Sequence, residues 1–499
     1  MPLLLGIVSE AGKRLNNSWI VETLQQTYNA LSTRWLNVSR DGAFDNAGNF
    51  YNILYGFATT DSRLISKTGY QARYTNVLRY TNNTGLQLLT MAPQQVTGNN
   101  LKLAGSVNPF FNGTSPLYEF SYSTISSFVN STTPNIVMKI DTSTMAVVWQ
   151  RSFNDSLGTY PLVISINKDA SNNALVYCLL NISGRWGRAL FSFSDAGALN
   201  WARYTDDGQS QTGSANFFGS SSIDSAGNSY ITYGRRTTNG ASTLAQFVMK
   251  YNSSGTVQWA RYLLNTASTA TAATYCGIGA ADTSGNYYVA GNYGDIASTK
   301  CLTKFDTNGN QIWSKYYSRD ITAGTGNIIL NSDPQIAVDA SGNVYMATMA
   351  FLSGIQNSVY CFIVKYDSSG NILWERQITY TGSALWANNG ASFYYFALSI
   401  NDTAQTFNIT TNTATTSGNT ANNQVDIRLP LDGSKLGSYV GTSTLTYTYS
   451  IPSAGTSGTT NITSVATTLT AQTPTISLAT ATQSFVTGTL PTSNIISIA

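Results

Sequence analysis

The sequence repeats one short motif at regular intervals, and this repetition constrains the fold more than any other feature. KYNSSGTVQWARY (250–262), KFDTNGNQIWSKY (304–316) and KYDSSGNILWERQ (365–377) share the pattern Lys, aromatic, Asp or Asn, x, x, Gly, x, x, x, Trp. The closing tryptophans Trp201, Trp259, Trp313 and Trp374 are 54 to 61 residues apart, and Trp149 precedes them by 52. A period in the fifties indicates a repeat architecture.

A second motif recurs about midway between the tryptophans. It contains Asp-x-x-Gly-Asn in AFDNAGNFYNILYG (43–56), SIDSAGNSYITYG (222–234), AADTSGNYYVAGN (280–292) and AVDASGNVYMATM (337–349). Its Asp, as in Asp224, Asp282 and Asp339, can accept a hydrogen bond from a backbone N–H two residues on, and its Gly supplies the positive φ of a tight hairpin. Each period therefore contains two hairpins, or four strands.

Four short antiparallel strands in a period of about 50 residues are typical of a propeller blade. The repeat degenerates at its ends, where Leu89 and Tyr439 stand in place of the tryptophan and Trp35 precedes the first turn motif. The span from Trp35 to Tyr439 contains seven intervals. The sequence predicts an all-β fold, a β-propeller of about seven four-stranded blades over residues 35–440, with six or eight blades as alternatives.

One tryptophan per repeat has a structural explanation. A large flat side chain on one strand of each blade can pack against the next blade and bury about 200 Å². We expect this packing role for Trp149, Trp201, Trp259, Trp313 and Trp374, since regular spacing favours it over a ring of aromatic platforms for sugars.

Two segments lie outside the repeat. Residues 1–34 form an N-terminal arm in which Ile20, Val21, Leu24, Tyr28 and Leu31 fit a helix better than a strand. This arm would anchor the chain on a partner or cap one face of the propeller. Residues 441–499 are rich in Thr and Ser and predict a β-rich tail that packs on the propeller or on another copy of the chain.

The composition excludes several classes of partner. Charged residues are 10% of the chain, the net charge is +3, and no run of like charges occurs, so we expect no nucleic-acid binding. No segment is apolar over the ~18 residues that a membrane span needs, and the start MPLLLGIVSEAG lacks a basic region typical of a signal peptide. The four cysteines are expected to be buried thiols; if two pair, Cys276 and Cys301 are favoured.

Catalysis is not expected, because the chain contains no histidine. This excludes Ser-His-Asp and Cys-His mechanisms and histidine-ligated metals. Carboxylate chemistry would need a pair such as Asp206 with Asp207 or Glu119, but most Asp residues belong to turns. Asp306 begins a sequence like a calcium loop, yet the twelfth position is Tyr317 rather than Glu. We therefore expect no metal and no cofactor.

The paired motifs resemble the β-propeller repeats of SBBP-like bacterial and phage surface proteins, and IDTSTMAVVW resembles the tryptophan motif of quinoprotein-type propellers. The resemblance implies the fold, and it does not carry quinoprotein activity because the vicinal disulfide and metal ligands of those enzymes are missing. The whole chain also resembles structural proteins of tailed bacteriophages, in its start without a signal, its Ser, Thr, Asn and Gly content, its lack of His and its Thr/Ser-rich tail.

This second resemblance implies a non-enzymatic virion protein, a tail fibre or another appendage, made in the host cytoplasm and assembled with other virion proteins, as a homo-oligomer. Irregular loops would contact a glycan or protein receptor of the host, with Phe110, Phe111, Tyr118 and Trp386 as candidate contacts. The alternatives are a glycosidase or depolymerase built on the propeller, and a scaffold protein of the bacterial envelope.

Overall fold

A computed structural model of the chain describes the strands and many of the turns. The described residues are 19–23, 34–35, 43–44, 50–57, 62–68, 74–80, 86–91, 100–107, 135–144, 146–155, 162–182, 185–210, 219–236, 244–265, 278–292, 299–318, 322–323, 326–330, 334–352, 355–381, 397–414, 422–440, 446–452, 456–459, 462–466, 471–472, 476–480, 485–487 and 493–497. Side chains are described for parts of residues 135–459.

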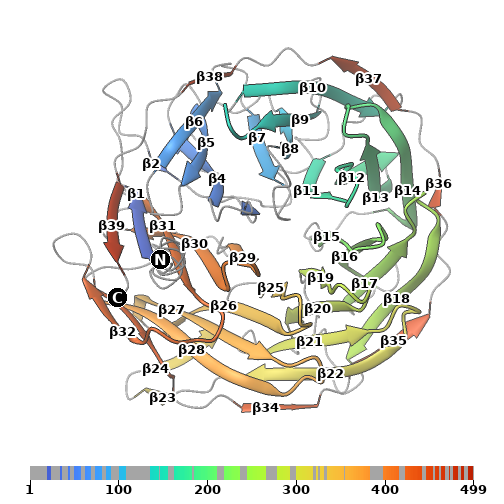
Figure 1. Cartoon of the computed structure of the whole chain (residues 1–499). Coiled ribbons are helices and arrows are strands. Elements are labelled where there is room, and N and C mark those ends of the chain that lie inside the picture. The colour runs from blue at the N-terminus through green and yellow to red at the C-terminus, as the bar shows by residue number, and fades with distance from the viewer. Residues whose placement is uncertain are drawn as a thin grey trace, which may run out of the picture.

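All elements in these ranges are β-strands, which confirms the all-β prediction. The strands form seven antiparallel sheets, the number that the interval count predicts. Figure 1 shows the sheets side by side around a ring, with the strands of a sheet following one another from the ring axis toward the rim. The arrangement is propeller-like.

We number the sheets in chain order. Sheet 1 contains β2 (Arg34–Trp35), β3 (Ala43–Phe44), β4 (Phe50–Phe57), β5 (Ser62–Thr68) and β6 (Tyr74–Tyr80). Sheet 2 contains β7 (Leu86–Met91), β8 (Asn100–Val107), β9 (Asn135–Asp141) and β10 (Ala146–Asp155). Sheet 3 contains β11 (Leu162–Lys168), β12 (Ala174–Ile182), β13 (Arg185–Phe193) and β14 (Leu199–Ser210).

Sheet 4 contains β15 (Gly219–Ile223), β16 (Ser229–Arg236), β17 (Leu244–Tyr251) and β18 (Val257–Asn265). Sheet 5 contains β19 (Gly279–Ala281), β20 (Tyr287–Asn292), β21 (Thr299–Phe305) and β22 (Gln311–Ser318). Sheet 6 contains β23 (Thr322–Ala323), β24 (Gly326–Leu330), β25 (Gln335–Val338), β26 (Val344–Leu352), β27 (Ile355–Tyr366), β28 (Ile372–Thr381) and β32 (Gly437–Val440). Sheet 7 contains β29 (Ala397–Asn401), β30 (Thr406–Ala414), β31 (Asn422–Pro430) and β1 (Trp19–Thr23).

The C-terminal tail adds one further strand to every sheet. Its strands are β33 (Thr446–Ser450), β34 (Thr456–Thr459), β35 (Ile462–Ala466), β36 (Ala471–Gln472), β37 (Ile476–Thr480), β38 (Phe485–Thr487) and β39 (Ser493–Ser497). They pair in turn with β28, β22, β18, β14, β10, β6 and β1. The tail therefore passes around the rim in the reverse of chain order, and we call these seven strands the rim belt.

The rim belt covers the outer edges that a four-stranded sheet leaves open. An uncovered edge presents unpaired N–H and C=O groups to other strands, which favours aggregation. Proteins often protect such edges with charged residues, but no Asp, Glu, Lys or Arg follows Lys435 in this sequence. Here the protection comes from strand pairing with the chain's own tail.

Sheet 7 joins the two ends of the chain and corrects part of the sequence interpretation. The helix expected in the arm is wrong for Trp19–Thr23, because this segment is the strand β1 and pairs on both sides, with β31 and β39. Pairing along both edges outweighs a helical period of apolar residues. Trp19 lies opposite Arg428, at the place that the repeat gives to its tryptophan.

The three outer marker positions are also wrong. Leu89 lies on β7, the first strand of sheet 2, rather than on a fourth strand. Tyr439 lies on β32 at the edge of sheet 6, and Trp35 lies on β2 opposite Gly56. The count of seven holds because β1 supplies the fourth strand of sheet 7.

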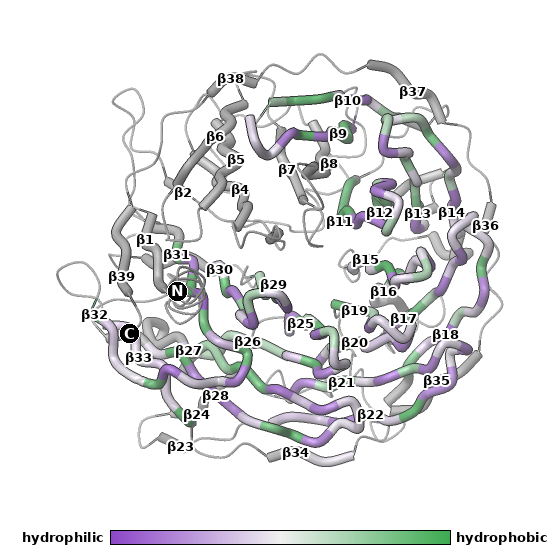
Figure 2. Tube along the Cα trace, in the orientation of Figure 1, coloured by the Kyte–Doolittle hydropathy of each residue, from purple (hydrophilic) through white to green (hydrophobic). Residues whose placement is uncertain are grey.

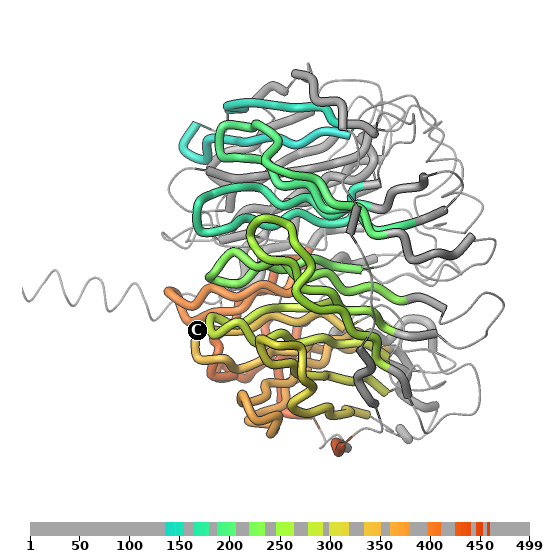
Figure 3. Tube along the Cα trace, turned by 90° about the vertical axis from the view of Figure 1, so that its right-hand side faces the viewer, coloured from blue at the N-terminus to red at the C-terminus, as the bar shows by residue number. Residues whose placement is uncertain are grey.

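The turn motifs form hairpins through side-chain hydrogen bonds. In the turn after β19, Asp282 Oδ1 accepts from the N–H groups of Ser284 and Asn286 at 2.9 and 2.8 Å, and its Oδ2 accepts from Asn286 Nδ2 at 2.8 Å. Gly285 takes a φ of +79° in this turn. Such local bonds close the hairpin without any distant contact, and Figure 3 shows turns of several sheets at the same face of the ring.

A bulge in the fourth strand of sheets 2 to 6 directs the repeat tryptophan toward the next sheet. In sheet 4 the pairing shifts between Lys250 opposite Trp259 and Tyr251 opposite Val257, so Gln258 is the extra residue. The same shift precedes Trp149, Trp201, Trp313 and Trp374. A bulge twists the strand locally and redirects the following side chain.

Each of these tryptophans lies against a positive-φ glycine of the next sheet. The pairs are Trp149 with Gly197, Trp201 with Gly255, Trp259 with Gly309, Trp313 with Gly370 and Trp374 with Gly433. In the first four pairs the indole N–H also donates to a carbonyl of the same turn, for example from Trp259 to Thr307 at 3.0 Å. The indole therefore joins adjacent sheets by packing and by a hydrogen bond.

A basic residue two positions after the tryptophan reinforces this contact. Arg203, Arg261 and Arg376 each donate from Nε to the carbonyl of the glycine in the next sheet, at 2.9, 2.8 and 2.6 Å. Their guanidinium groups lie 5.2–5.7 Å from the ring centres of Trp201, Trp259 and Trp374. We call this contact between adjacent sheets the staple. Its sequence is Trp-x-Arg, with Lys315 in the Arg position of sheet 5.

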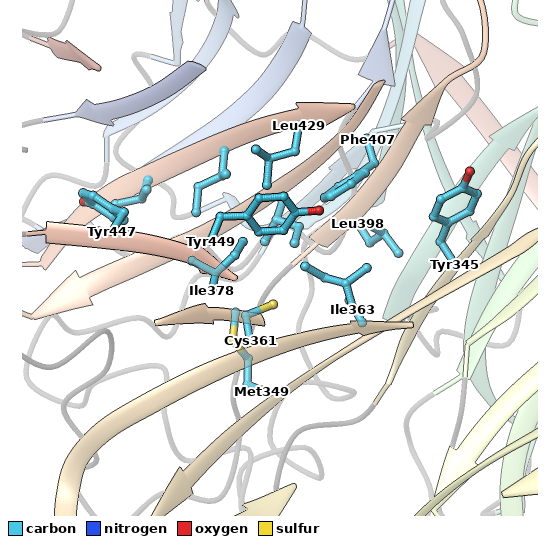
Figure 4. Packing of buried hydrophobic residues seen from close by; sticks show 14 of the residues in the cluster. Tyr345, Met349, Cys361, Ile363, Ile378, Leu398, Phe407, Leu429, Tyr447 and Tyr449 are labelled. Atoms are coloured by element: carbon cyan, nitrogen blue, oxygen red, sulfur yellow. The ribbon is translucent and has the colours of Figure 1, made fainter. Parts of the chain in front are cut away.

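Apolar side chains between neighbouring sheets form the core. One cluster between sheets 6 and 7 includes Ile363, Ile378, Leu398 and Phe407, all less than 9% exposed, and Figure 4 shows these side chains filling the space between the strands. Hydrophobic residues are spread over strands of several sheets rather than gathered in one (Figure 2). Stability is therefore distributed around the ring.

The described cysteines are buried free thiols. Cys178, Cys301 and Cys361 lie in sheets 3, 5 and 6 and form no disulfide. A bond between Cys276 and Cys301 is therefore wrong for Cys301, while Cys276 lies outside the described residues. Burial raises the pKa of Cys301 to about 12, which suppresses thiolate formation.

The turns between the third and fourth strands of sheets 5 and 6 predict that the stability of the fold decreases in acid. Burial opposes ionisation of Asp306 and Asp367, but hydrogen bonds from Asn310 and Asn371 outweigh it and lower both pKa values. In the unfolded chain such groups protonate near pH 3.9. A lowered folded pKa contributes stability above that pH, and this contribution is lost as pH falls further. We expect the urea midpoint to fall steeply below about pH 4.

The control variant copies the turn of sheet 4, where Asn252 Oδ1 accepts from the N–H groups of Ser254 and Thr256 without a carboxylate. Asp306→Asn with Asn310→Thr reproduces that turn in sheet 5. Urea unfolding at pH 7 and pH 3 should show a smaller acid loss in this variant. An equal loss in variant and parent would contradict the assignment.

Candidate functional site: the axial cavity

A cavity of about 610 Å³ lies where the innermost strands of five sheets meet. It is lined by residues of β11, β15, β19, β25 and β29 and of the turns that follow some of them. These strands surround the centre of the ring in Figure 1. The cavity therefore lies along the ring axis, and its wall is formed by the innermost strand of each of these five sheets.

Serines of β15 connect the inner strands across this wall. Ser220 and Ser222 accept hydrogen bonds from the N–H groups of Gly279 and Ala281 on β19, at 2.8 and 3.0 Å. On the other side Ser221 Oγ lies 2.7 Å from Ser165 Oγ of β11, and Ser165 Oγ accepts from the N–H of Ser221 at 3.1 Å. The hydroxyls thus satisfy inner-edge N–H groups that no strand pairs.

Amide side chains continue the polar lining. Asn167, which is 2% exposed, donates from Nδ2 to Ser221 Oγ at 2.6 Å. Gln335, Ser399 and Asn401 also line the cavity and are buried. Because buried polar groups need partners, this network fixes the orientation of the inner strands.

The carboxylates at the cavity are held by turn hydrogen bonds. Asp224 Oδ1 accepts from the N–H groups of Ala226 and Asn228 at 3.0 and 2.8 Å, and its Oδ2 lies 2.8 Å from Asn228 Nδ2 and 3.0 Å from the Tyr230 hydroxyl. The arrangement around Asp282 is the same, with Tyr288 at 3.3 Å. Each carboxylate is thus held in place by hydrogen bonds from its own hairpin.

Asp402 differs from the other cavity carboxylates. Burial raises its pKa, with Asp339 adding to the rise, although the N–H of Ala340 donates to its Oδ1 at 3.0 Å. In this turn Asn401 takes the capping role, because its Oδ1 accepts from the N–H of Ala404. Asp402 therefore links sheet 7 to the inner turn of sheet 6.

One cation also lines the cavity. Lys168 is 4% exposed and donates from Nζ to Asn172 Oδ1 at 3.3 Å, so it too takes part in a turn. No aromatic side chain occurs among the described residues that line the cavity. Four carboxylates also line it, those of Asp169, Asp224, Asp282 and Asp402, so the described wall combines neutral hydrogen-bonding groups with a net negative charge.

The predicted repeat residues lie in two places. Asp224 and Asp282 reach one end of the cavity, and Asp339 forms the equivalent turn of sheet 6, where its Oδ1 accepts from the N–H groups of Ser341 and Asn343. The tryptophans lie on the fourth strands, toward the rim (Figure 1). The structure thus separates turn and cavity residues from the staple residues.

The predicted binding residues Phe110, Phe111, Tyr118 and Trp386 lie outside the described residues, as does Glu119. Asp206 and Asp207 are on β14, but their side chains are not described. Among described side chains no cluster of three or more His, Cys, Asp or Glu residues could hold a metal ion. No helix in the described ranges is long and apolar enough to cross a membrane.

The sequence analysis did not predict the role of the β15 serines that line the cavity, which we call the serine wall. It also did not predict the role of the basic residue of the staple. Both had a signal: GSSSI directly precedes the Asp of the inner turn, and a basic residue follows every marker tryptophan from Trp149 to Trp374 at the second position. The turn motif is recognised by its Asp and Gly, whereas the serines beside it do not belong to any hydrophobic periodicity that would indicate a role.

Comparison with known proteins gives little further information. No family model matches the sequence, and no curated protein matches it. A solved structure described as the crystal structure of polysaccharide lyase Uly1 is similar at 9% identity and a TM-score of 0.42, over 79% of this chain and 90% of that chain. A TM-score this low does not relate the two activities.

Proposed function

We propose that this protein is a non-enzymatic structural protein of a bacteriophage virion, a tail fibre or another tail or capsid appendage, built on a seven-bladed β-propeller. The observation that carries the proposal is the axial cavity, whose wall consists largely of serine hydroxyls and side-chain amides and whose carboxylates Asp224 and Asp282 are engaged in turns. General acid–base catalysis needs a group free to exchange protons with a substrate. A wall of hydroxyl and amide groups supports binding or assembly instead.

The ring supports the second part of the proposal, attachment to a host surface. Staples such as Trp259 and Arg261 on Gly309 hold neighbouring sheets at fixed positions. Rigid sheets can present loops of variable length to a receptor. The proposed contacts are the loop residues Phe110, Phe111, Tyr118 and Trp386, and the proposed partners are other virion proteins and a glycan or protein of the host surface.

The rim belt supports a role outside the cell. A particle protein must survive for long periods without chaperones, and open sheet edges would promote aggregation. The belt pairs the outer strand of each described sheet within one chain. We propose that the chain is made in the host cytoplasm and incorporated into the virion, where copies assemble as a homo-oligomer.

Mass spectrometry of purified particles tests the location. We expect the intact chain in gradient-purified virions at a fixed ratio to the major capsid protein, and at background level in washed host envelopes. Recovery in envelopes alone would refute the virion assignment and favour an envelope scaffold.

Binding and cleavage assays test the activity. The tagged full chain should bind host cells, and Ser replacement of Phe110, Phe111, Tyr118 and Trp386 together should weaken binding by about tenfold or more, since aromatic residues dominate contact energies. Val148→Ser, at an exposed position 53% accessible, is the matched control. Release of new reducing ends from host polysaccharide would instead identify a depolymerase.

A further inference from the structure

Two segments of this chain fit the same place in sheet 7. The turns after β27 and β31 correspond, because Gly370 N donates to Asp367 O at 3.0 Å and Gly433 N donates to Pro430 O at 3.1 Å. Both glycines have positive φ, +83° and +74°, and each lies against the tryptophan of the preceding sheet. Gly433 is thus the repeat equivalent of Gly370.

This equivalence places the remaining residues of the seventh repeat. Lys365, five residues before Gly370, lies opposite Trp374, four residues after it. The same spacing from Gly433 puts Arg428 opposite Gly437. In the structure, however, Arg428 lies opposite Trp19 of β1. The N-terminal strand therefore occupies the position of the repeat's own fourth strand.

The displaced strand is β32, which begins at Gly437. It pairs with β33 at the outer edge of sheet 6, through four residue pairs from Gly437 opposite Tyr449 to Val440 opposite Thr446. Ser438 and Val440 are exposed, Val440 at 72%, whereas Tyr439 is partly buried and packs against the cluster between sheets 6 and 7. The strand is therefore held by one short ladder and by the packing of one tyrosine, next to the sheet from which it is excluded.

We infer that the outer edge of β31 is a strand-exchange site: β1 holds it in this structure, and β32 is a spare strand that replaces β1 when the N-terminal arm leaves. β1 is favoured because it brings a tryptophan to a position where β32 has glycine. β32 remains joined to β31 through the turn at Asp432 and Gly433, so its return needs only a local rearrangement. The ring can then release its N-terminal arm without opening.

Two changes to the full chain test the exchange. Ile20→Pro with Glu22→Pro removes β1, because proline cannot donate to a ladder and β1 lies between two strands. Ser438→Cys with Thr448→Cys fixes β32 on β33 when oxidised, since these side chains lie opposite each other with oxygens 3.0 Å apart and exposed. All variants carry Cys276→Ser, and Ile20→Val with Glu22→Gln is the matched control for the prolines.

Hydrogen exchange of the β31 amides from Val425 to Leu429 is the readout. In the proline variant we expect protection to persist when the cysteines are reduced and to fall at least tenfold when they are oxidised. In the control variant the redox state should not matter. Gly437→Trp should further raise protection in the reduced proline variant, because it restores the repeat tryptophan.

Two results would overturn the inference. One is equal protection of β31 in the reduced and oxidised proline variants, which would show that β32 does not replace β1. The other is failure of the proline variant to fold in either redox state, which would show that sheet 7 has no substitute for β1.

Discussion

Replacing Trp259 with alanine is expected to lower the free energy of unfolding by about 3–5 kcal/mol. The side chain is 8% exposed, packs on Gly309, contacts the rings of Tyr230 and Phe305, and donates to Thr307. Its loss leaves a cavity between sheets 4 and 5 and removes one of two hydrogen bonds to the Thr307 carbonyl, which keeps the bond from Lys250 Nζ at 3.1 Å, and both effects destabilise the contact.

Urea unfolding followed by circular dichroism measures this effect, and Gln258→Ala is the matched control. Gln258 is the bulged residue directly before Trp259 on the same strand, but its side chain bonds only to the carbonyl of Thr256. Its replacement should change stability by less than about 0.5 kcal/mol. Similar losses for the two variants would refute the staple as the link between these sheets.

Replacing Gly309 with alanine is expected to destabilise the chain by about 3 kcal/mol or more, from two separable causes. The φ of +78° is strained for any residue with a Cβ, at a cost of about 1–2 kcal/mol. The new Cβ would also lie 2.6 Å from Trp259 Cδ2, so the indole would have to move.

Gly227 separates the two causes. Its φ is +79°, but a Cβ there would meet only Ser253 Cβ, at 3.5 Å. Gly227→Ala should therefore show the backbone cost alone. In a Trp259→Ala background the excess cost of Gly309→Ala over Gly227→Ala should disappear. An excess that survives removal of the indole would mean that the steric explanation is wrong.

The repeating part of the fold was predictable because its signals are local. In Asp282-x-x-Gly285-Asn286 the bonds that close the hairpin join residues within five positions of one another. Such a turn forms in the same way wherever the sequence occurs. The number of sheets and the all-β class follow from counting these turns and the tryptophans.

The ends of the chain were not predictable because their partners are distant. Trp19 pairs with Arg428 and Ser497, and nothing within the segment WIVET indicates either partner. The apolar spacing of Ile20, Val21 and Leu24 favours a helix only while the segment is considered alone. For the same reason the tail predicted strands but not their addition to successive sheets.

The candidate site was predictable in part. Asp224 and Asp282 were assigned to turns, which is how the structure uses them, but their place at the end of a cavity depends on how five sheets meet. The serine wall depends on the same arrangement, since Ser220 and Ser222 bond to a strand that begins at Gly279. Contacts between neighbouring repeats are invisible to a pattern within one repeat.

The reverse path of the rim belt determines when the sheet edges are covered during synthesis of the chain. β1 is synthesised long before its neighbour β39, which ends at Ser497. At typical translation rates of about 5–20 residues per second, that neighbour follows on the order of 25–100 s later. A nascent chain stopped before Thr446 would have none of the seven belt strands and would expose the outer strand of each sheet to other nascent chains. Synthesis of the belt strands, rather than formation of the individual sheets, is the step that protects the sheet edges from aggregation.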